Sequence, residues 1–321
     1  MLGALAAIPI AGISWTVHGQ TLHRISILSA GNRATYSHLF AAFEAGLRDL
    51  GYVAGENVSL NYRFADGQFA KLPALAAEIA RDMPKVVLVQ STPAATAAKK
   101  FITEIPIVIV GVADPVGSGL VASLARPGGN ITGVTNISAE LTGKRLAIMK
   151  ELIPKLSSIA AIVNPDDPNV KLQMKNAGDA ATSLGLRLWP VLELRKADDL
   201  AKVFTTAGNS GVTAAIRMVD PLNNTLRKPF VELAERHRLP IIYPWREDTE
   251  SGGLISYGTS QSDQFRQASV FIDKILKGAH PRDLPVEQPT KFELVINQRT
   301  ARALGLTIPQ SLLISANTLI E

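Results

Sequence analysis

One stretch of the sequence, Val86–Ala97, decides the fold, and it reads VVLVQSTPAATA. The apolar run Val86–Val89 is typical of a strand that is buried on both faces of a parallel sheet. Pro93 suits the first turn of a helix, because proline lacks the N–H group that stays unpaired there. The stretch therefore predicts a buried strand that leads through a short polar edge into a helix, the repeating unit of an α/β fold.

The same alternation of short apolar runs and amphipathic helical patterns continues from Arg24 to the C-terminus. The other predicted strands are Ile25–Leu28, Val58–Phe64, Ile105–Val110, Ile131–Val134, Ile159–Asn164, Leu186–Leu194, Ala214–Asp220, Leu239–Tyr243 and Gly253–Tyr257. So many strands would make one sheet unusually large, so two sheets in two lobes are the better interpretation. We therefore expect an α/β protein with two parallel sheets, each covered by helices on both faces.

The two lobes are expected to share the chain, because no linker rich in proline and glycine divides its 321 residues. Three candidate crossings between the lobes are Gly133–Asn136, Ser256–Gly258 and Glu287–Lys291. The predicted division is residues 24–133 with 259–286 for lobe 1, and residues 134–258 with 287–321 for lobe 2. Several short connections of this kind predict a hinge rather than a flexible tether.

The first segment, residues 1–23, has a different composition. It contains no Lys, Arg, Asp or Glu, and Leu2–Trp15 is an almost unbroken apolar run. Such a run is too short to span a bilayer as a helix but suits the apolar region of a secretory signal. The basic residues that usually precede that region are missing, and a tail or a buried first helix are the alternatives. We expect a leader segment and a periplasmic or otherwise extracytoplasmic protein.

Composition and motifs argue against several classes of protein. The absence of cysteine excludes disulfides, thiolate metal sites and cysteine nucleophiles. The net charge of +5 is spread without a basic block, so no nucleic-acid partner is expected. The five histidines lack metal-ligand spacing, and no metal is expected. Gly117–Ala122 fits a dinucleotide pattern but lies beyond its strand, and Gly143-Lys144-Arg145 is not a P-loop. We therefore expect neither a cofactor nor an enzyme.

Polar residues follow the predicted strands, at the edge where parallel sheets bind ligands. The candidates in lobe 1 are Ser29, Ala30, Gly31, Ser91, Thr92, Ala113 and Asp114. The candidates in lobe 2 are Asn164, Asp220, Tyr243, Trp245 and Glu247. Tyr36, on the first predicted helix, is a further candidate because an apolar part of a ligand can rest on it. If the two edges face each other, these residues line a cleft between the lobes.

The helix that begins near Ser91 has two interpretations. Free N–H groups and a partial positive charge at a helix N-terminus form a site for a carboxylate. Alternatively, Ser91 or Thr92 simply caps its own helix. Asp114 and Asp220, each followed by proline, also have two interpretations. Each is either a turn or cap residue or a partner for a ligand ammonium group.

Several longer strings carry a family resemblance. They are Phe43–Tyr52, Leu72–Glu78, Gly111–Val121, Leu124–Gly133 and Leu284–Phe292. In order along the chain, they resemble the ABC-transporter solute-binding family typified by tryptophan- and tyrosine-type binding proteins. The resemblance implies a type I periplasmic-binding fold, with two Rossmann-like lobes, three crossover segments and a ligand in the cleft. It also implies binding without bond chemistry, a small-molecule ligand, and the membrane permease of an ABC importer as partner. We expect a monomer.

The resemblance implies that the ligand touches the candidate residues of both lobes. Two residues that bear on the ligand depart from the family's usual pattern. Gln90 stands where glycine is more usual, and Arg217 lies in a strand where related proteins usually have apolar residues. Arg217 is either a structural ion-pair member or a second cationic contact. We expect an amino acid, an aromatic one included, with its carboxylate at Ser91-Thr92 and its ammonium near Asp114 or Asp220. Its side chain would rest against Tyr36, Phe40, Tyr243 or Trp245.

Three other classes are the alternatives. A binding protein for an aromatic acid, sugar or nucleoside would use the same cleft. A LacI-type regulator needs a helix-turn-helix segment of about sixty residues at its N-terminus, for which the early strand pattern leaves no room. An α/β enzyme needs a nucleophile–base pair or a cofactor loop, and the sequence provides neither.

Overall fold

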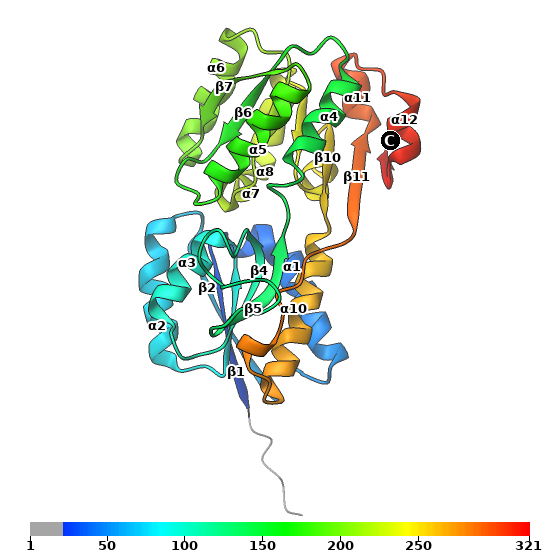
Figure 1. Cartoon of the computed structure of the whole chain (residues 1–321). Coiled ribbons are helices and arrows are strands. Elements are labelled where there is room, and N and C mark those ends of the chain that lie inside the picture. Colours follow the sequence, from blue (N-terminus) through cyan, green and yellow to red (C-terminus); the bar gives the residue numbers. More distant parts are fainter. Residues whose placement is uncertain (1–21) are drawn as a thin grey trace, which may run out of the picture.

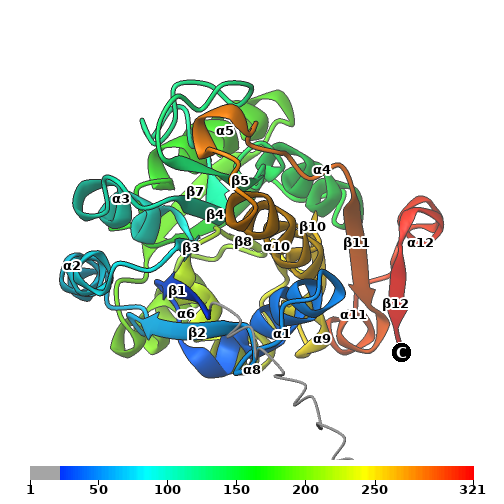
Figure 2. The same ribbon diagram turned by 90° about the horizontal axis from the view of Figure 1, so that it is seen from below.

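The computed structural model describes residues 22–321, which fold into two α/β lobes (Figure 1). The predicted leader segment lies outside the described residues except for its last two positions. Each lobe is built on its own sheet, with helices packed against both faces (Figures 1 and 2). The expected α/β class with two parallel-sheet lobes is therefore confirmed. Within the described residues, no helix is both long enough and apolar enough to span a membrane.

Lobe 1 contains a five-stranded sheet with the order β2-β1-β3-β4-β5, in which every pairing is parallel. Its strands are β1 (His23–Ser29), β2 (Val58–Phe64), β3 (Val86–Gln90), β4 (Ile107–Ala113) and β5 (Ile131–Asn136). Its helices are α1 (Arg33–Asp49), α2 (Leu72–Asp82), α3 (Thr92–Phe101) and α10 (Gln261–Leu276). Helix α10 returns from late in the sequence and packs beside α1, as Figure 2 shows.

Lobe 2 contains a seven-stranded sheet with the order β12-β11-β10-β9-β8-β6-β7. Its strands are β6 (Ser158–Val163), β7 (Arg187–Glu193), β8 (Ala215–Arg217), β9 (Ile241–Tyr243), β10 (Ile255–Thr259), β11 (Phe292–Asn297) and β12 (Thr318–Ile320). Its helices are α4 (Thr142–Leu152), α5 (Val170–Ser183), α6 (Leu200–Asn209), α7 (Pro221–Thr225), α8 (Arg227–Arg236), α9 (Arg246–Glu250), α11 (Gln298–Leu304) and α12 (Gln310–Ser315). Strand β11 is antiparallel to β10, so this sheet is mixed.

Every predicted strand is present, from β1 to β10, but β11 and β12 escaped prediction. Strand β8 is shorter than the predicted run Ala214–Asp220, because Asp220 already serves as the N-cap of α7. The apolar runs are buried as a two-sided sheet requires: all five residues of β3 are buried, as are all three of β9. The rigid sheets thus hold the polar strand ends at a common edge.

The chain passes between the lobes after β5, after β10 and before β11. The last passage is tied to the first, because the Glu287 N–H donates to the Gly133 carbonyl and the Glu287 carbonyl accepts from the Thr135 N–H, both at 2.9 Å. Arg145, on α4 and 1% exposed, joins the first passage, after β5, to the second, after β10. Its guanidinium donates to the Ser138 carbonyl at 2.9 Å and to the Tyr257 carbonyl at 2.7 Å. These contacts hold the three connections together beside the cleft.

Candidate ligand-binding site

A cavity lies between the carboxyl-terminal edges of the two sheets. Lobe 1 lines it with Tyr36, Gln90, Ser91, Thr92, Gly111 and Asn136, and with Gln261 at the start of α10. Lobe 2 lines it with Asp167, Asn169, Val219, Asp220, Pro221, Asn224 and Trp245. The centre of a water molecule can reach only ≈ 20 Å³ of it. The lobes are therefore closely apposed over a small, largely polar space.

On the lobe 1 side, the N-terminus of α3 meets this cavity. Ser91 is the N-cap residue, but its side chain makes no capping hydrogen bond. Its hydroxyl oxygen is buried and has no partner among the described residues, and its φ of 84° lies in the left-handed region. Ser91 therefore occupies the expected N-cap position, but its side chain does not satisfy the helix that it begins. The first-turn N–H groups of α3 and the Ser91 hydroxyl form a set of donors for an anionic group.

Neighbouring residues of lobe 1 hold this helix start in place. The Thr92 hydroxyl oxygen accepts a hydrogen bond from the Ala113 N–H at 3.1 Å, which ties α3 to the end of β4. Ser29 is fully buried, and its hydroxyl donates to the Gln90 side-chain oxygen at 2.9 Å. Ser29 thus positions Gln90, which lines the cavity, rather than lining it itself.

On the lobe 2 side, Asp220 is the N-cap of α7, as one interpretation of the sequence expected. It also lines the cavity, where a ligand could reach it. Its carboxylate accepts from the N–H groups of Leu222 at 2.8 Å and Asn223 at 3.1 Å. The Asn164 side-chain amide also donates to it, at 3.2 Å. Asp220 is 1% exposed. A fixed, buried carboxylate therefore faces the cavity.

A second carboxylate, Asp167, lies beside Asp220 and is 3% exposed. Burial, with repulsion from Asp220 added, raises the pKa of Asp167 to about 8. Burial also raises the pKa of Asp220, to about 6, although its backbone hydrogen bonds and the Arg217 charge oppose the shift. Two carboxylates that repel each other in a dry site favour a cation between them. The pair is therefore suited to an ammonium group.

Behind the carboxylates, Arg217 is a structural ion-pair member. It is fully buried, and its guanidinium donates to Asp248 at 2.5 Å and to the Asn224 side-chain oxygen at 3.1 Å. Arg227 shares the same Asp248 carboxylate at 3.1 Å. The Asn224 amide in turn donates to the Tyr36 hydroxyl of lobe 1 at 3.0 Å. Arg217 thus orients an interlobe contact and does not line the cavity.

Two further polar atoms in the cavity walls lack partners among the described residues: the Trp245 indole N–H and the Gln261 side-chain oxygen. Trp245 is 2% exposed and Gln261 7%. Buried polar groups without partners carry a free-energy cost unless a ligand or water satisfies them. Together with Ser91, they indicate walls built to contact a polar ligand.

Of the sequence-predicted site residues, five meet at the cavity: Tyr36, Ser91, Thr92, Asp220 and Trp245. The others lie elsewhere. Asn164 lines a neighbouring groove between the lobes, and Glu247 faces His38 of lobe 1 across the cleft at 3.3 Å. Ala30 and Gly31, like Ser29, are buried beside the cavity, as is Ala113 behind Thr92. These residues support the site from outside its lining.

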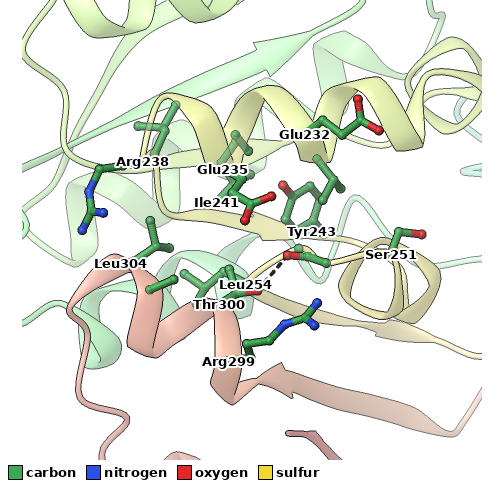
Figure 3. A pocket seen from close by; sticks show the side chains of 16 residues that line it. Glu232, Glu235, Arg238, Ile241, Tyr243, Ser251, Leu254, Arg299, Thr300 and Leu304 are labelled. Carbon is green, nitrogen blue, oxygen red and sulfur yellow. Dashed lines mark hydrogen bonds between the residues drawn. The ribbon is translucent and has the colours of Figure 1, made fainter.

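Asp114 and Tyr243 are the clearest departures from the predicted site. The Asp114 carboxylate accepts from the Gly117 N–H at 2.7 Å, so it closes a turn and does not line the cavity. Tyr243 points into lobe 2, where it lines a separate pocket of ≈ 310 Å³ between α8 and α11 (Figure 3). Asp114 follows β4 and Tyr243 ends β9. The turn after β4 and the packing of β9 direct these two side chains away from the cavity.

The predicted site lacks part of the lining: Gln90, Gly111, Asn136, Asp167, Asn169, Val219, Pro221, Asn224 and Gln261. Gln90 and Gly111 stand at the ends of predicted strands, and Asp167 in the loop after another, so strand ends alone pointed to them. Gln261 and Asn224 belong to helices, and only the packing of the lobes brings them to the cavity.

Comparisons with known proteins agree with this architecture. The family described as ABC transporter substrate binding protein matches residues 33–320. The chain belongs to this family. Proteins of this family bind a substrate for transport and are not enzymes, so this substrate-binding protein has no catalytic site to assign. The resemblance noted in the sequence is confirmed.

Three known proteins are similar to this substrate-binding protein. A tyrosine-binding protein of Clostridioides difficile is 28% identical over 273 residues, which are 82% of this chain and 75% of that protein. The ABC domain from Streptococcus pneumonia in complex with L-Trp is 26% identical, with a TM-score of 0.86 over 94% of this chain and all of that one. A conserved domain protein from Vibrio cholerae is 25% identical, with a TM-score of 0.88 over 93% of this chain and all of that one.

Proposed function

We propose that this substrate-binding protein captures an amino acid between its lobes, outside the cytoplasm, and delivers it to the permease of an ABC importer. One observation carries the proposal: donors at the α3 N-terminus and the carboxylates Asp167 and Asp220 face the same cavity. An α-amino acid has the matching pair of charges. Its carboxylate would meet Ser91 and α3, and its ammonium would meet the two aspartates.

An aromatic side chain suits the remaining walls. Tyr36 and Trp245 both line the cavity, and their rings offer apolar surface with a polar group at one end. The names of two similar proteins, which refer to tyrosine and L-Trp, support the same class of ligand. An aromatic acid without an amine is the rival, but it would leave the aspartate pair without a cation.

Ligand capture would proceed by closure of the hinge. Three interlobe contacts support this: Thr92 with Asn169 at 2.7 Å, Tyr36 with Asn224 at 3.0 Å, and His38 with Glu247. The space left inside the cavity is too small for an amino acid to occupy without separation of the lobes. A ligand that touches both edges binds the closed arrangement better than an open one, and so shifts the equilibrium towards closure.

Calorimetry with the twenty amino acids tests the proposal. We expect at least one, with L-tyrosine and L-tryptophan as the first probes, to bind with a Kd of about 1 μM, or about −8 kcal/mol. The deaminated analogue and the decarboxylated analogue of that ligand should each bind about 100-fold more weakly, because each leaves buried charged groups unpaired. Equal binding of the deaminated analogue would favour the aromatic-acid alternative. No heat with any amino acid would refute the proposal.

A further inference from the structure

Helix α7 contacts both the cavity and the opposite lobe. Its N-cap residue Asp220 and its residues Pro221 and Asn224 line the cavity. Leu222 and Thr225, on another face of the same short helix, line a groove of ≈ 850 Å³ between the lobes. Because one helix carries both sets of residues, its distance from lobe 1 affects the cavity and the groove together.

Besides Tyr36, whose hydroxyl accepts from Asn224, lobe 1 meets α7 through Gly67, in the loop after β2. A Cβ atom at this position would lie 3.1 Å from the Leu222 Cδ1 and 3.5 Å from the Thr225 hydroxyl oxygen. The loop is held in place, since the Gly67 N–H donates to the Ala30 carbonyl at 2.8 Å. The φ of Gly67 is +77°, in the left-handed region. Lobe 1 therefore presents bare backbone to α7.

We propose that Gly67 sets how closely lobe 1 approaches α7 and thereby determines the affinity for the ligand. This inference rests on the proposed capture of an amino acid by closure. Gly67 and Leu222 both border the groove, and the Leu222 N–H donates to the Asp220 carboxylate that lines the cavity. A side chain at position 67 would hold α7 away from lobe 1. The Tyr36–Asn224 hydrogen bond, made by the same helix, would then lengthen, and water would reach the carboxylates.

The test compares Gly67→Asn with the matched control Gly55→Asn. Asparagine tolerates the left-handed region better than other residues with a side chain, so the backbone cost is small at both positions. Gly55 has a similar φ of +87°, but nothing lies within 4 Å of a Cβ there. With L-tyrosine and L-tryptophan as probes, we expect the Gly67→Asn variant to bind at least 10-fold more weakly, and the control to stay within 2-fold of wild type.

Two further measurements separate closure from folding. The two ligand-free variants should unfold at similar temperatures, whereas the stabilisation by bound amino acid should be smaller for Gly67→Asn, as its lower affinity requires. Adding Leu222→Ala to Gly67→Asn should restore part of the affinity, because it makes room for the new side chain. If Gly67→Asn does not fold, Gly67→Ala against Gly55→Ala gives the same comparison.

The outcomes are distinct. Equal affinities for the position 67 and position 55 variants, with wild type binding normally, would overturn the role of Gly67 and leave the proposed function intact. Failure of wild type to bind any amino acid would overturn both the proposed function and this inference. Weaker binding by Gly67→Asn that the added Leu222→Ala substitution partly restores would support the role of Gly67.

Discussion

The two edges that face each other across the cavity differ in their chemistry. The side chains that lobe 1 contributes are uncharged, and the N-terminus of α3 supplies its only concentration of positive charge along the described lining. Lobe 2 contributes two carboxylates, Asp167 and Asp220. One lobe thus offers backbone dipoles to an anion, and the other offers a pair of carboxyl groups to a cation. The difference supports the proposal that each lobe recognises a different end of an amino acid.

The two edges also differ in the free energy that is needed to remove water from them. Backbone N–H groups at a helix start are polar but carry no net charge, so the lobe 1 edge is inexpensive to dehydrate. The carboxyl groups of lobe 2 are buried, and their raised pKa values express the free-energy cost of keeping them charged there. Closure on a ligand without an ammonium group retains that penalty. Lobe 2 is therefore expected to decide which ligands are rejected.

The largest effect is expected from Asp220→Asn, which removes one of the two carboxyl groups that lobe 2 offers to an ammonium group. Affinity for the bound amino acid should fall about 100-fold, or about 2.7 kcal/mol, within the range for hydrogen bonds to charged groups. Asparagine is as good an N-cap as aspartate, so α7 should remain folded. Calorimetry measures the affinity and circular dichroism checks the fold. Unchanged affinity would mean that the ammonium lies elsewhere.

A second test of lobe 2 separates binding from stability through Asp167→Asn. The folded-state pKa of Asp167, about 8, lies above its ordinary value of 3.8, so the folded protein holds a proton that the unfolded chain has lost. The free energy of unfolding therefore falls as the pH rises from about 4 to about 8. The asparagine variant lacks this loss. Without ligand it should be more stable than wild type at pH 8, and similar to it at pH 4.

The same Asp167→Asn variant should bind the amino acid about 30-fold more weakly, because one of two carboxylates is lost. Thermal unfolding at both pH values and calorimetry at pH 8 give the two results. A variant that is less stable than wild type at pH 8 would show that Asp167 contributes to folding through its charge. Opposite signs for stability and affinity are the expected signature of a carboxylate kept for a ligand.

The difference between the lobes was only partly predictable from the sequence. Apolar runs predicted every strand from β1 to β10, and strand ends led to Ser91, Thr92 and Asp220, because in a parallel sheet the strand ends share one edge. The late β11 and β12 escaped, since the apolar run of β11, Leu294–Ile296, is short and the strand pairs antiparallel with an earlier one, β10. Long-range pairing of this kind leaves little trace in local pattern.

The side-chain directions at the cavity were harder to predict than the edge itself. Asp114 follows its strand as Asp220 does, but a left-handed φ of 39° turns it onto Gly117. Tyr243 lies at the end of β9, yet its ring packs among the buried residues of lobe 2. Gln261 enters from a helix whose sequence lies far from the other lobe 1 residues. Such outcomes depend on tertiary packing, which a single strand pattern does not contain.

On lobe 1, Ser91→Ala should have a smaller effect than either change in lobe 2. The hydroxyl is one donor among several at the start of α3, so affinity should fall about 10-fold, or about 1.4 kcal/mol. Stability without ligand should be nearly unchanged, because the hydroxyl makes no hydrogen bond within the described residues. Calorimetry and thermal unfolding check both points. A fall in stability would show instead that Ser91 supports the fold.

The smallest effect is expected at the rim, where His38 of lobe 1 meets Glu247 of lobe 2. The His38 side chain is 40% exposed, so solvent screens the pair, and His38→Gln should weaken ligand binding by less than about 3-fold. Calorimetry of both proteins measures this difference. A loss as large as that of Asp220→Asn would move the main determinant of closure from the cavity to its rim.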